Sequence, residues 1–231
     1  MARRGEAKSV SADVYQRIRM SIFNGSLRPG DRLQPAQLSQ QYDASTTVVR
    51  EALAQLAGER LVTSKVGQGY FIPTIEREEL RDITTVRCQV ESLAVRMSME
   101  RGGVEWESAL LAAHHRLART PRRTEDNPDH PSQEWATVHR AFHAQLVGAC
   151  RVPTLLDVCE QLFSATELYR VWAGAVGGSK RDVEAEHAAI LHAALAGDPD
   201  RTVDLLTAHY TATATQIIDN WPGADQASKS A

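Results

Sequence analysis

Apolar residues in the first third of the chain recur at helical spacing and then at strand-like spacing. Val14, Ile18 and Ile22 follow one another at four-residue intervals, which predicts an amphipathic helix over about 11–24. A second helix begins at Pro35, because proline suits the first turn, where its missing N–H has no partner. Between these helices, glycines and a proline over 25–31 predict a turn.

A third helix and a hairpin complete this region. Ser45 is a good N-cap, and the helix after it carries an apolar face made of Val49, Ala52, Leu53 and Leu56, before Gly58 ends it. Two β-prone runs follow, 61–63 and 70–72, with Gly67-Gln68-Gly69 between them as a glycine-rich hairpin tip. The order helix, helix, helix, hairpin predicts a winged helix-turn-helix over residues 1–74.

The rest of the chain has helical periodicity only. The predicted helices cover about 76–101, 106–119, 134–149, 153–172, 180–196 and 199–220. In the first of them the residues expected to face inward are Leu80, Ile83, Val86, Val90 and Leu93. We therefore predict a mainly α protein, with the winged helix-turn-helix followed by an all-α antiparallel six-helix bundle over 75–222 and a disordered tail over 223–231.

Composition narrows the class of protein without changing this picture. The chain has 231 residues, of which 42% are hydrophobic, and no apolar run reaches the roughly 18 residues of a membrane span. No apolar stretch with a cleavage site follows the basic first residues, so no signal peptide is predicted. Cys88, Cys150 and Cys159 form neither a C-x-x-C pair nor an even set. We expect a cytoplasmic protein that makes no contact with a membrane and has no disulfide framework.

Charge is divided unevenly between the two regions. Residues 1–75 hold ten Lys or Arg against six Asp or Glu, whereas residues 76–231 hold sixteen against twenty-three. A net acidic protein still binds nucleic acid when its positive charge is local. The N-terminal region is therefore the candidate nucleic-acid interface, although scattered solvated charge explains the same counts.

The predicted third helix offers suitable chemistry for DNA. Its first turns carry Ser45, Thr46, Thr47 and Arg50, whose hydroxyl and guanidinium groups suit phosphates and base edges in a major groove. The alternative is a winged helix that binds another protein. We expect double-stranded DNA as the partner and a homodimer as the binding form, because two-fold operators need paired readers.

Four histidines point to a metal site in the helical region. His139 and His143 are four residues apart and share one helix face, while His187 and His209 lie on the inward sides of two later helices. Imidazoles suit zinc, nickel, copper or ferrous iron. The alternative is a set of core or surface histidines. We expect the remaining four to be solvated surface residues: His114, His115, His130 and His192.

Two competing functions use the same histidines. A metal sensor would respond to the cation itself, and a metalloenzyme would use it to activate a substrate. Against an enzyme, the chain has no H-E-x-x-H and no G-x-S-x-G motif, and four histidine ligands leave little room for an activated water.

Specific motifs add a resemblance to a known family. Residues 25–33 (GSLRPGDRL), 49–56 (VREALAQL) and 67–72 (GQGYFI) resemble the DNA-binding domain of GntR-type bacterial regulators. The resemblance implies DNA contacts at Ser45, Thr46, Thr47 and Arg50, with Gln68 and Gly69 in the wing. The family often has Arg at the position of Thr46 and Pro at that of Val48, which changes the operator sequence expected.

The helical region resembles the FCD effector domain of the FadR subfamily. The resemblance is carried by Arg87 with Glu91, by Phe142-His143, by 186–198 and by His209. Metal-binding members use one Asp and three His, and this chain has His139 in the place of the Asp. The resemblance implies a divalent metal, zinc first and nickel or another transition metal next, held by His139, His143, His187 and His209. With three protein ligands, His139 would instead contact the effector.

Further likeness, over 101–107 and 139–150, is to the carbon-starvation-induced regulators within that subfamily. It implies a small dicarboxylate effector such as glutarate. We expect a repressor whose operator binding such a carboxylate controls. Arg87 and Arg170 are the candidates to grip the carboxylate, with Tyr169 as a hydrogen-bond donor. The alternatives are an ion pair with Glu91 for Arg87 and a surface position for Arg170.

Overall fold

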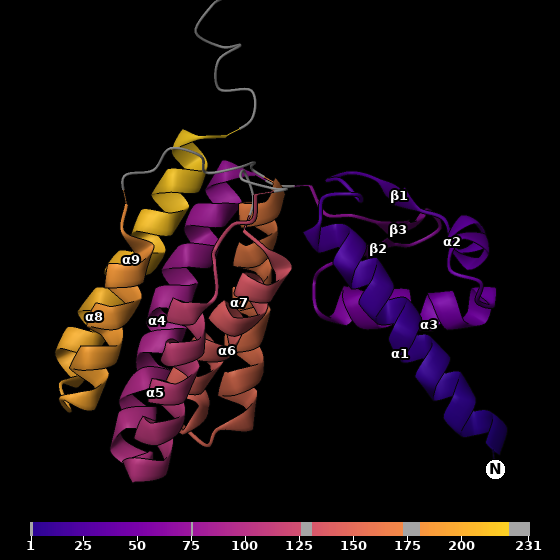
Figure 1. Cartoon of the computed structure of the whole chain (residues 1–231). Coiled ribbons are helices and arrows are strands. Elements are labelled where there is room, and N and C mark those ends of the chain that lie inside the picture. The colour runs from indigo at the N-terminus through magenta and orange to yellow at the C-terminus, as the bar shows by residue number, and fades with distance from the viewer. Residues whose placement is uncertain (1, 75, 126–130, 173–180, 222–231) are drawn as a thin grey trace, which may run out of the picture. The chain divides into compact units, whose positions relative to one another are not determined.

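The computed structural model describes residues 2–74, 76–125, 131–172 and 181–221 (Figure 1). The chain forms two compact units, which we describe separately. The first unit contains Met1–Glu76 together with Glu167–Trp172, and the second contains Arg77–Thr166 together with Ala173–Ala231. The predicted tail over 223–231 lies outside the described residues.

Three helices build most of the first unit. They are α1 (Ala2–Phe23), α2 (Pro35–Gln41) and α3 (Thr46–Gly58). Their buried residues include every apolar position that the periodicity selected: Val14, Ile18, Ile22, Leu38, Val49, Ala52, Leu53 and Leu56. Pro35 opens α2 as predicted, and Gly25 follows α1 with a φ of 77°, a left-handed conformation that favours glycine.

A small antiparallel sheet completes the first unit. It contains β1 (Arg32–Leu33), β2 (Thr63–Lys65) and β3 (Gly69–Phe71) in the order β1-β3-β2. Thr63 pairs with Phe71, so the predicted strand over 61–63 is wrong in position: Leu61 and Val62 are buried just before the strand begins. Strand β1 was not predicted, because two residues are too few to show an alternating pattern.

Six helices build the described part of the second unit. They are α4 (Arg77–Arg101), α5 (Gly103–Arg119), α6 (Gln133–Gly148), α7 (Pro153–Trp172), α8 (Val183–Leu195) and α9 (Pro199–Asp219). The end of α7, from Glu167 onward, is counted with the first unit. Helix α4 packs against α6 and α9, while α5 packs against α6 and α8 (Figure 1). The α4–α5 junction needs a glycine, since a Cβ on Gly102 would lie 2.7 Å from the Ser98 carbonyl oxygen. The prediction of six helices is confirmed.

Helix α4 packs with a face that agrees only in part with the predicted one. Its buried positions are Leu80, Thr84, Arg87, Cys88, Glu91, Ala94, Val95 and Ser98. Val86 and Leu93, which were expected inside, are 49% and 54% exposed, and Ile83 and Val90 are only half-buried. Leu80 of the predicted set is buried and Val90 packs against the core, so the apolar repeat leaves the packed face at Val86 and Leu93.

Two further sequence expectations concern exposure. Cys88, Cys150 and Cys159 are all free and buried. Among the described residues, no helix combines the length and the apolar character that a membrane span requires.

Candidate metal centre and nucleic-acid interface

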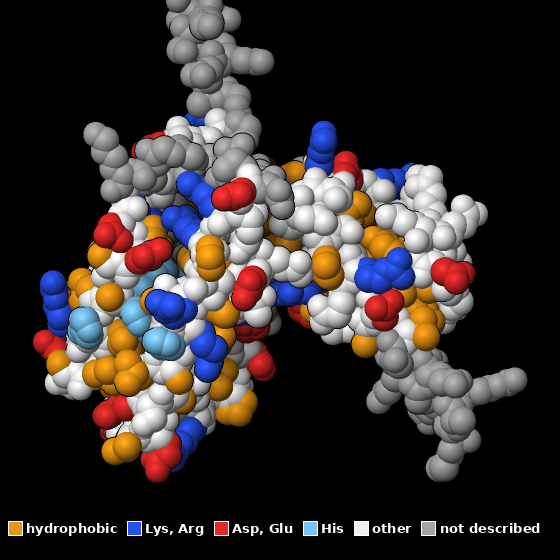
Figure 2. Space-filling model, in the orientation of Figure 1, with side chains coloured by type: hydrophobic (Ala, Val, Ile, Leu, Met, Phe, Trp, Pro, Cys, Tyr) orange, Lys and Arg blue, Asp and Glu red, His pale blue; other side chains and the backbone are white. Residues whose placement is uncertain are grey.

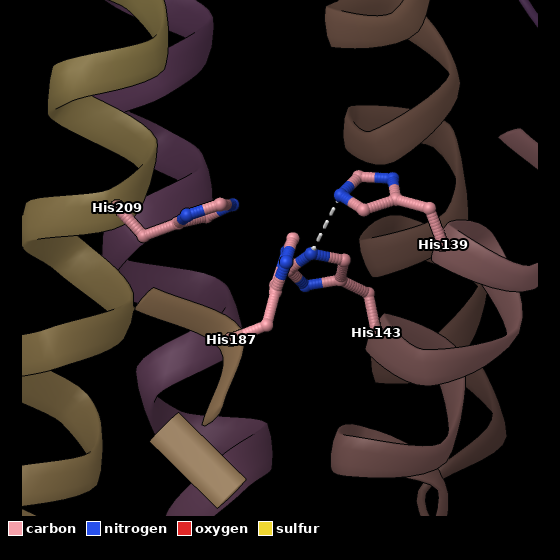
Figure 3. Close-up of side chains that lie close together, drawn as sticks. All are labelled: His139, His143, His187 and His209. Carbon is pink, nitrogen blue, oxygen red and sulfur yellow. Dashed lines mark hydrogen bonds between the residues drawn. The ribbon is translucent and has the colours of Figure 1, made fainter. Parts of the chain in front are cut away.

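The four predicted histidines meet in the core of the second unit. His139 and His143 come from α6, His187 from α8 and His209 from α9, and all four are at most 5% exposed. One ring nitrogen from each lies within 4.8 Å of those of the other three. Figure 3 shows the rings converging from both sides on one region between the helices.

Hydrogen bonds behind His143 determine which of its nitrogens faces the cluster. The Tyr210 hydroxyl donates its one proton to Glu91 and lies 3.0 Å from Nδ1 of His143. That hydroxyl oxygen therefore accepts from His143 Nδ1–H, and in the neutral imidazole Nε2 of His143 is the nitrogen that carries the lone pair. This Nε2 lies 3.1 Å from Nε2 of His139.

The carboxylate of Glu186 orients the ring of His209. Its Nδ1 lies 2.7 Å from Oε2 of Glu186, and Arg181 pairs with the same carboxylate. Burial alone would raise the pKa of Glu186, but hydrogen bonds from His209 and Arg181 lower it to about 2. Burial lowers the pKa of His209 to about 4, although its bond to Glu186 acts in the opposite direction. His209 is therefore neutral at pH 7, with Nε2 free of a proton for metal binding.

The geometry fits a transition-metal ion. Two imidazole nitrogens on a tetrahedral zinc ion, each at 2.0–2.1 Å, would lie about 3.3 Å apart. The 3.1 Å separation of Nε2 in His139 and His143 is close to that value. Two lone pairs at this distance repel unless a proton or a cation lies between them. The donor set is all nitrogen, which favours zinc, nickel or copper over magnesium or calcium.

The charges around the cluster are already balanced. Glu91 forms a buried ion pair with Arg87, with Oε1 and Nε 2.5 Å apart, and Glu186 pairs with Arg181. The alternative considered for Arg87, an ion pair with Glu91, is thus the arrangement present. The guanidinium of Arg87 also lies 3.8 Å from the centre of the Tyr210 ring, which places it behind His143.

The other two predicted effector residues belong to the other compact unit. Tyr169 and Arg170 lie in the Glu167–Trp172 segment at the end of α7. Tyr169 is buried, and Arg170 is half-buried and forms an ion pair with Glu167. The role of both residues as effector contacts stays a prediction.

A cavity adjoins the cluster and contains arginines that the sequence analysis missed. It has a volume of about 140 Å³, and its lining includes His187, His114, Trp135, Arg122 and Arg181. Arg122 comes from the segment after α5 and stacks over the Trp135 ring at 5.3 Å. No spacing rule relates these arginines to the histidines, although Arg181 precedes His187 by only six residues.

The predicted DNA-contact residues are exposed in the first unit. Ser45 caps α3 by accepting a hydrogen bond from the Val48 amide at 3.3 Å, as predicted. Thr46, Thr47 and Arg50 lie exposed on the first turns of α3, and Gln68 and Gly69 are exposed at the β2–β3 tip.

An arginine from β1 supports this tip. Arg32 donates a hydrogen bond to the Gln68 carbonyl oxygen at 2.9 Å and so ties the loop to the sheet. On the face shown in Figure 2, lysine and arginine side chains are mixed with acidic ones instead of forming one basic surface.

Comparison with known families divides the chain at the same place as its fold. Residues 10–72 match the family described as bacterial regulatory proteins, gntR family. Residues 82–212 match the FCD domain and contain all four histidines.

Two transcriptional regulators are similar to this chain over most of its length. The chain is 32% identical to the HTH-type transcriptional regulator BphR of Paraburkholderia xenovorans over 202 residues, which cover 87% of this chain and 82% of that protein. It is also 32% identical to the HTH-type transcriptional repressor GlaR of Escherichia coli, with 86% and 91% covered. Both relatives are transcriptional regulators and neither is named as an enzyme.

Solved structures confirm the fold. Escherichia coli McbR/YncC superposes with a TM-score of 0.73 at 20% identity, covering 91% of this chain and 97% of that one. A GntR regulator from Rhodococcus sp. RHA1 gives a TM-score of 0.70 at 23% identity, with 91% and 98% covered. These matches agree with the mainly α architecture predicted from the sequence.

Proposed function

The chain belongs to the GntR family of bacterial transcriptional regulators, with an FCD domain after its DNA-binding domain, and from this premise we propose a metal-assisted carboxylate sensor. The winged helix-turn-helix binds operator DNA as part of a homodimer, and a small carboxylate bound at the FCD metal controls that binding. Repression is the proposed direction, since one of the relatives is a repressor.

The balance of charges around the histidines is the observation that supports a carboxylate as the effector. The histidines offer nitrogen ligands, and the carboxylates of Glu91 and Glu186 are already paired with Arg87 and Arg181. A divalent cation would bring its full charge into a buried, balanced site, where an unpaired charge is costly. An anionic carboxylate is the ligand that offsets this charge.

Different residues would bind the metal ion and the carboxylate. The imidazoles of His139, His143, His187 and His209 would hold the ion, which supplies positive charge for the carboxylate. His139 has a second possible role as an effector contact, which leaves three histidine ligands. Arg87, Tyr169 and Arg170 remain the predicted effector residues, and we add Arg122 and Arg181 because they line the adjoining cavity. An effector shifts DNA binding only if it binds the two states of the protein unequally.

Thermal unfolding tests this proposal directly. The protein is melted with glutarate and other small dicarboxylates, once with zinc and once after chelation. A ligand at 100 times its Kd stabilises the folded state by about 2.7 kcal/mol, so the melting temperature should rise by a few degrees only when zinc is present. A melt that responds neither to zinc nor to chelation would refute the metal site.

The zinc content of histidine variants distinguishes metal ligands from histidines that lie nearby. His187→Ala should lower bound zinc and effector affinity together, and His192→Ala, an exposed histidine of the same helix, should change neither. Elemental analysis gives the metal content of both variants. A full complement of zinc in His187→Ala would exclude His187 as a ligand. A direct metal sensor is distinguished by DNA affinity that follows free zinc without any carboxylate.

DNA binding is tested on a duplex that the protein itself selects from a random pool. Arg50→Ala should weaken binding and reduce the slope of log affinity against log salt by about one, as loss of one phosphate contact predicts. The exposed Arg28, in the turn after α1, provides the matched control. Equal affinities for the two variants would show that α3 is not the DNA-reading helix.

A further inference from the structure

A histidine outside the cluster shares a cavity with one of the four cluster histidines. We expected His114 at the surface, but it is half-buried on α5. Its ring and the ring of His187 are both in edge contact with Phe142, with centroids 5.6 and 5.4 Å from the centre of that ring. His114 and His187 also line the same cavity of about 140 Å³. Among the described residues, the set of converging nitrogens does not include His114, which therefore lies beside the metal site without belonging to it.

This cavity connects the surface of the second unit with the cluster. Its lining includes Ala118, Asp182 and Glu184, which are exposed. It also includes Trp135 and His187, which are only 3% and 2% exposed. The cavity therefore leads from solvent to the buried ring of His187.

A metal ion needs such a passage because the cluster itself is closed to solvent. All four histidines of the cluster are at most 5% exposed. An ion that left its water ligands at the surface and crossed a buried region without new ligands would meet a large desolvation cost. A buried metal site therefore requires an entry path, and one that offers replacement ligands lowers this cost.

His114 has the chemistry of such a replacement ligand. Burial lowers the pKa of its imidazole, and His192 and His115 act in the same direction. The ring is therefore neutral at pH 7, and one of its nitrogens carries a lone pair. Zinc, nickel and copper all accept an imidazole nitrogen. At intermediate depth in the cavity, His114 thus offers the same kind of donor as the cluster beyond it.

The charges along the cavity do not oppose a cation. Its lining contains two arginines, Arg122 and Arg181, and two acidic residues, Asp182 and Glu184. Arg181 is in addition paired with the carboxylate of Glu186. Positive and negative groups are therefore balanced, and a divalent ion meets no excess of positive charge on its way to His187.

We propose that His114 is a transfer ligand, which takes a zinc ion or a similar divalent cation from solvent and passes it to His187. One metal–nitrogen bond forms at His187 as one breaks at His114, and no proton moves between the two neutral rings. This inference rests on the metal site of the proposed function and describes how that site is loaded and emptied. Because His114 is a ligand in neither end state, it changes uptake and release by the same factor and leaves the dissociation constant unchanged.

Stopped-flow measurement on the full chain tests the role of His114. Metal-free protein is mixed with zinc to measure uptake, and zinc-loaded protein is mixed with excess chromophoric chelator to measure release. His114→Phe keeps an aromatic ring against Phe142 but removes both nitrogens. Uptake and release should each become slower by about tenfold, while the zinc dissociation constant stays within about twofold. His115→Phe is the matched control, since His115 is exposed and is not among the described residues of the lining.

Three results would overturn this role. Wild-type rates in His114→Phe would show that the ion does not need the imidazole. A raised dissociation constant with an unchanged uptake rate would make His114 a support of the bound site instead of a transfer ligand. In His114→Ala the ring is lost and the cavity widens, so faster loading would show that the passage needs only room. Slower loading in His114→Ala is the expected result.

Narrowing the cavity tests the route independently of His114. Ala118→Trp places a large ring at an exposed part of the lining and should slow uptake and release together, again without changing the dissociation constant. Ala112→Trp is the control, because Ala112 is exposed on the same helix but is not among the described residues of the lining. Equal rates in these two variants would overturn the proposal, since the ion would then reach the cluster by another way.

The same measurements separate failure of this inference from failure of the proposed function. If the wild-type chain binds no zinc, the sensor is wrong and the transfer role falls with it. If the wild-type chain binds one zinc ion that His187→Ala loses, but His114→Phe loads at the wild-type rate, the transfer role is wrong and the metal site stands.

Discussion

Replacing Glu186 by Gln removes the charge that orients His209 while keeping the shape of the side chain. In the structure Oε2 of Glu186 lies 2.7 Å from Nδ1 of His209, and Arg181 pairs with the same carboxylate. The glutamine retains a carbonyl oxygen that accepts from Nδ1–H, so the variant tests charge more than contact. We expect weaker zinc binding with the histidine cluster intact.

The expected loss of zinc affinity follows from the kind of hydrogen bond that the Glu186→Gln substitution changes. A bond to a charged acceptor contributes about 1.5–3 kcal/mol, and a neutral one about 0.5–1.5 kcal/mol. The difference, about 1–2 kcal/mol, corresponds to a rise of about 5- to 30-fold in the zinc dissociation constant. Loss of an outer carboxylate partner of a metal-bound histidine commonly weakens metal binding by about 10- to 100-fold, which overlaps this range.

Competition with a chromophoric chelator measures the dissociation constant. Glu184→Gln is the control, because Glu184 is an exposed residue of the same helix and its replacement makes the same change of charge. Long-range electrostatics alone would affect the two variants similarly. If Glu186→Gln bound zinc within twofold of Glu184→Gln, the assigned orientation of His209 would be refuted.

Three further predictions concern the folded state. Ser45→Ala should lower the free energy of unfolding by about 1 kcal/mol in urea titrations, because the α3 cap is lost; no change would mean that Val48 N–H finds another acceptor. Tyr210→Phe should cost about 1–3 kcal/mol in the same assay, since it leaves buried groups of His143 and Glu91 without their shared hydroxyl; a neutral result would contradict that chain of hydrogen bonds. In the metal-free protein, burial lowers the pKa of His209 to about 4. Between about pH 6.5 and pH 4, His209 is therefore protonated in the unfolded chain but not in the folded one. Metal-free stability should fall across that window by up to about 3 kcal/mol, and His209→Gln should flatten the profile.

The sequence was sufficient for elements whose signal is local. The helices of the winged domain follow from an apolar period of 3.6 and from residues such as Pro35 and Ser45, whose backbone preferences act within one turn. The hairpin was found, but its first strand was misplaced by two residues, because Leu61 and Val62 are apolar for burial in the core and not for strand pairing.

The histidine cluster was predictable in part for the same reason. An i, i+4 pair such as His139 and His143 shares a helix face wherever the helix lies, and the inward faces of α8 and α9 were evident from their apolar neighbours. That three helices would bring the four rings within 4.8 Å of one another rested on resemblance to the FCD domain, and only the packing of α6, α8 and α9 decided it.

Tertiary structure alone decided what surrounds the cluster and which side of α4 is inside. Tyr210 lies 119 residues from Glu91 and 67 from His143, and no local pattern relates positions so far apart. On α4 the apolar period was clear, but periodicity identifies a face without saying what covers it. The buried face of α4 contains the Arg87–Glu91 ion pair, to which Tyr210 of α9 donates, while Val86 and Leu93 of the apolar repeat stay exposed. A sequence specifies faces through the geometry of one helix, whereas contacts depend on how several helices pack together.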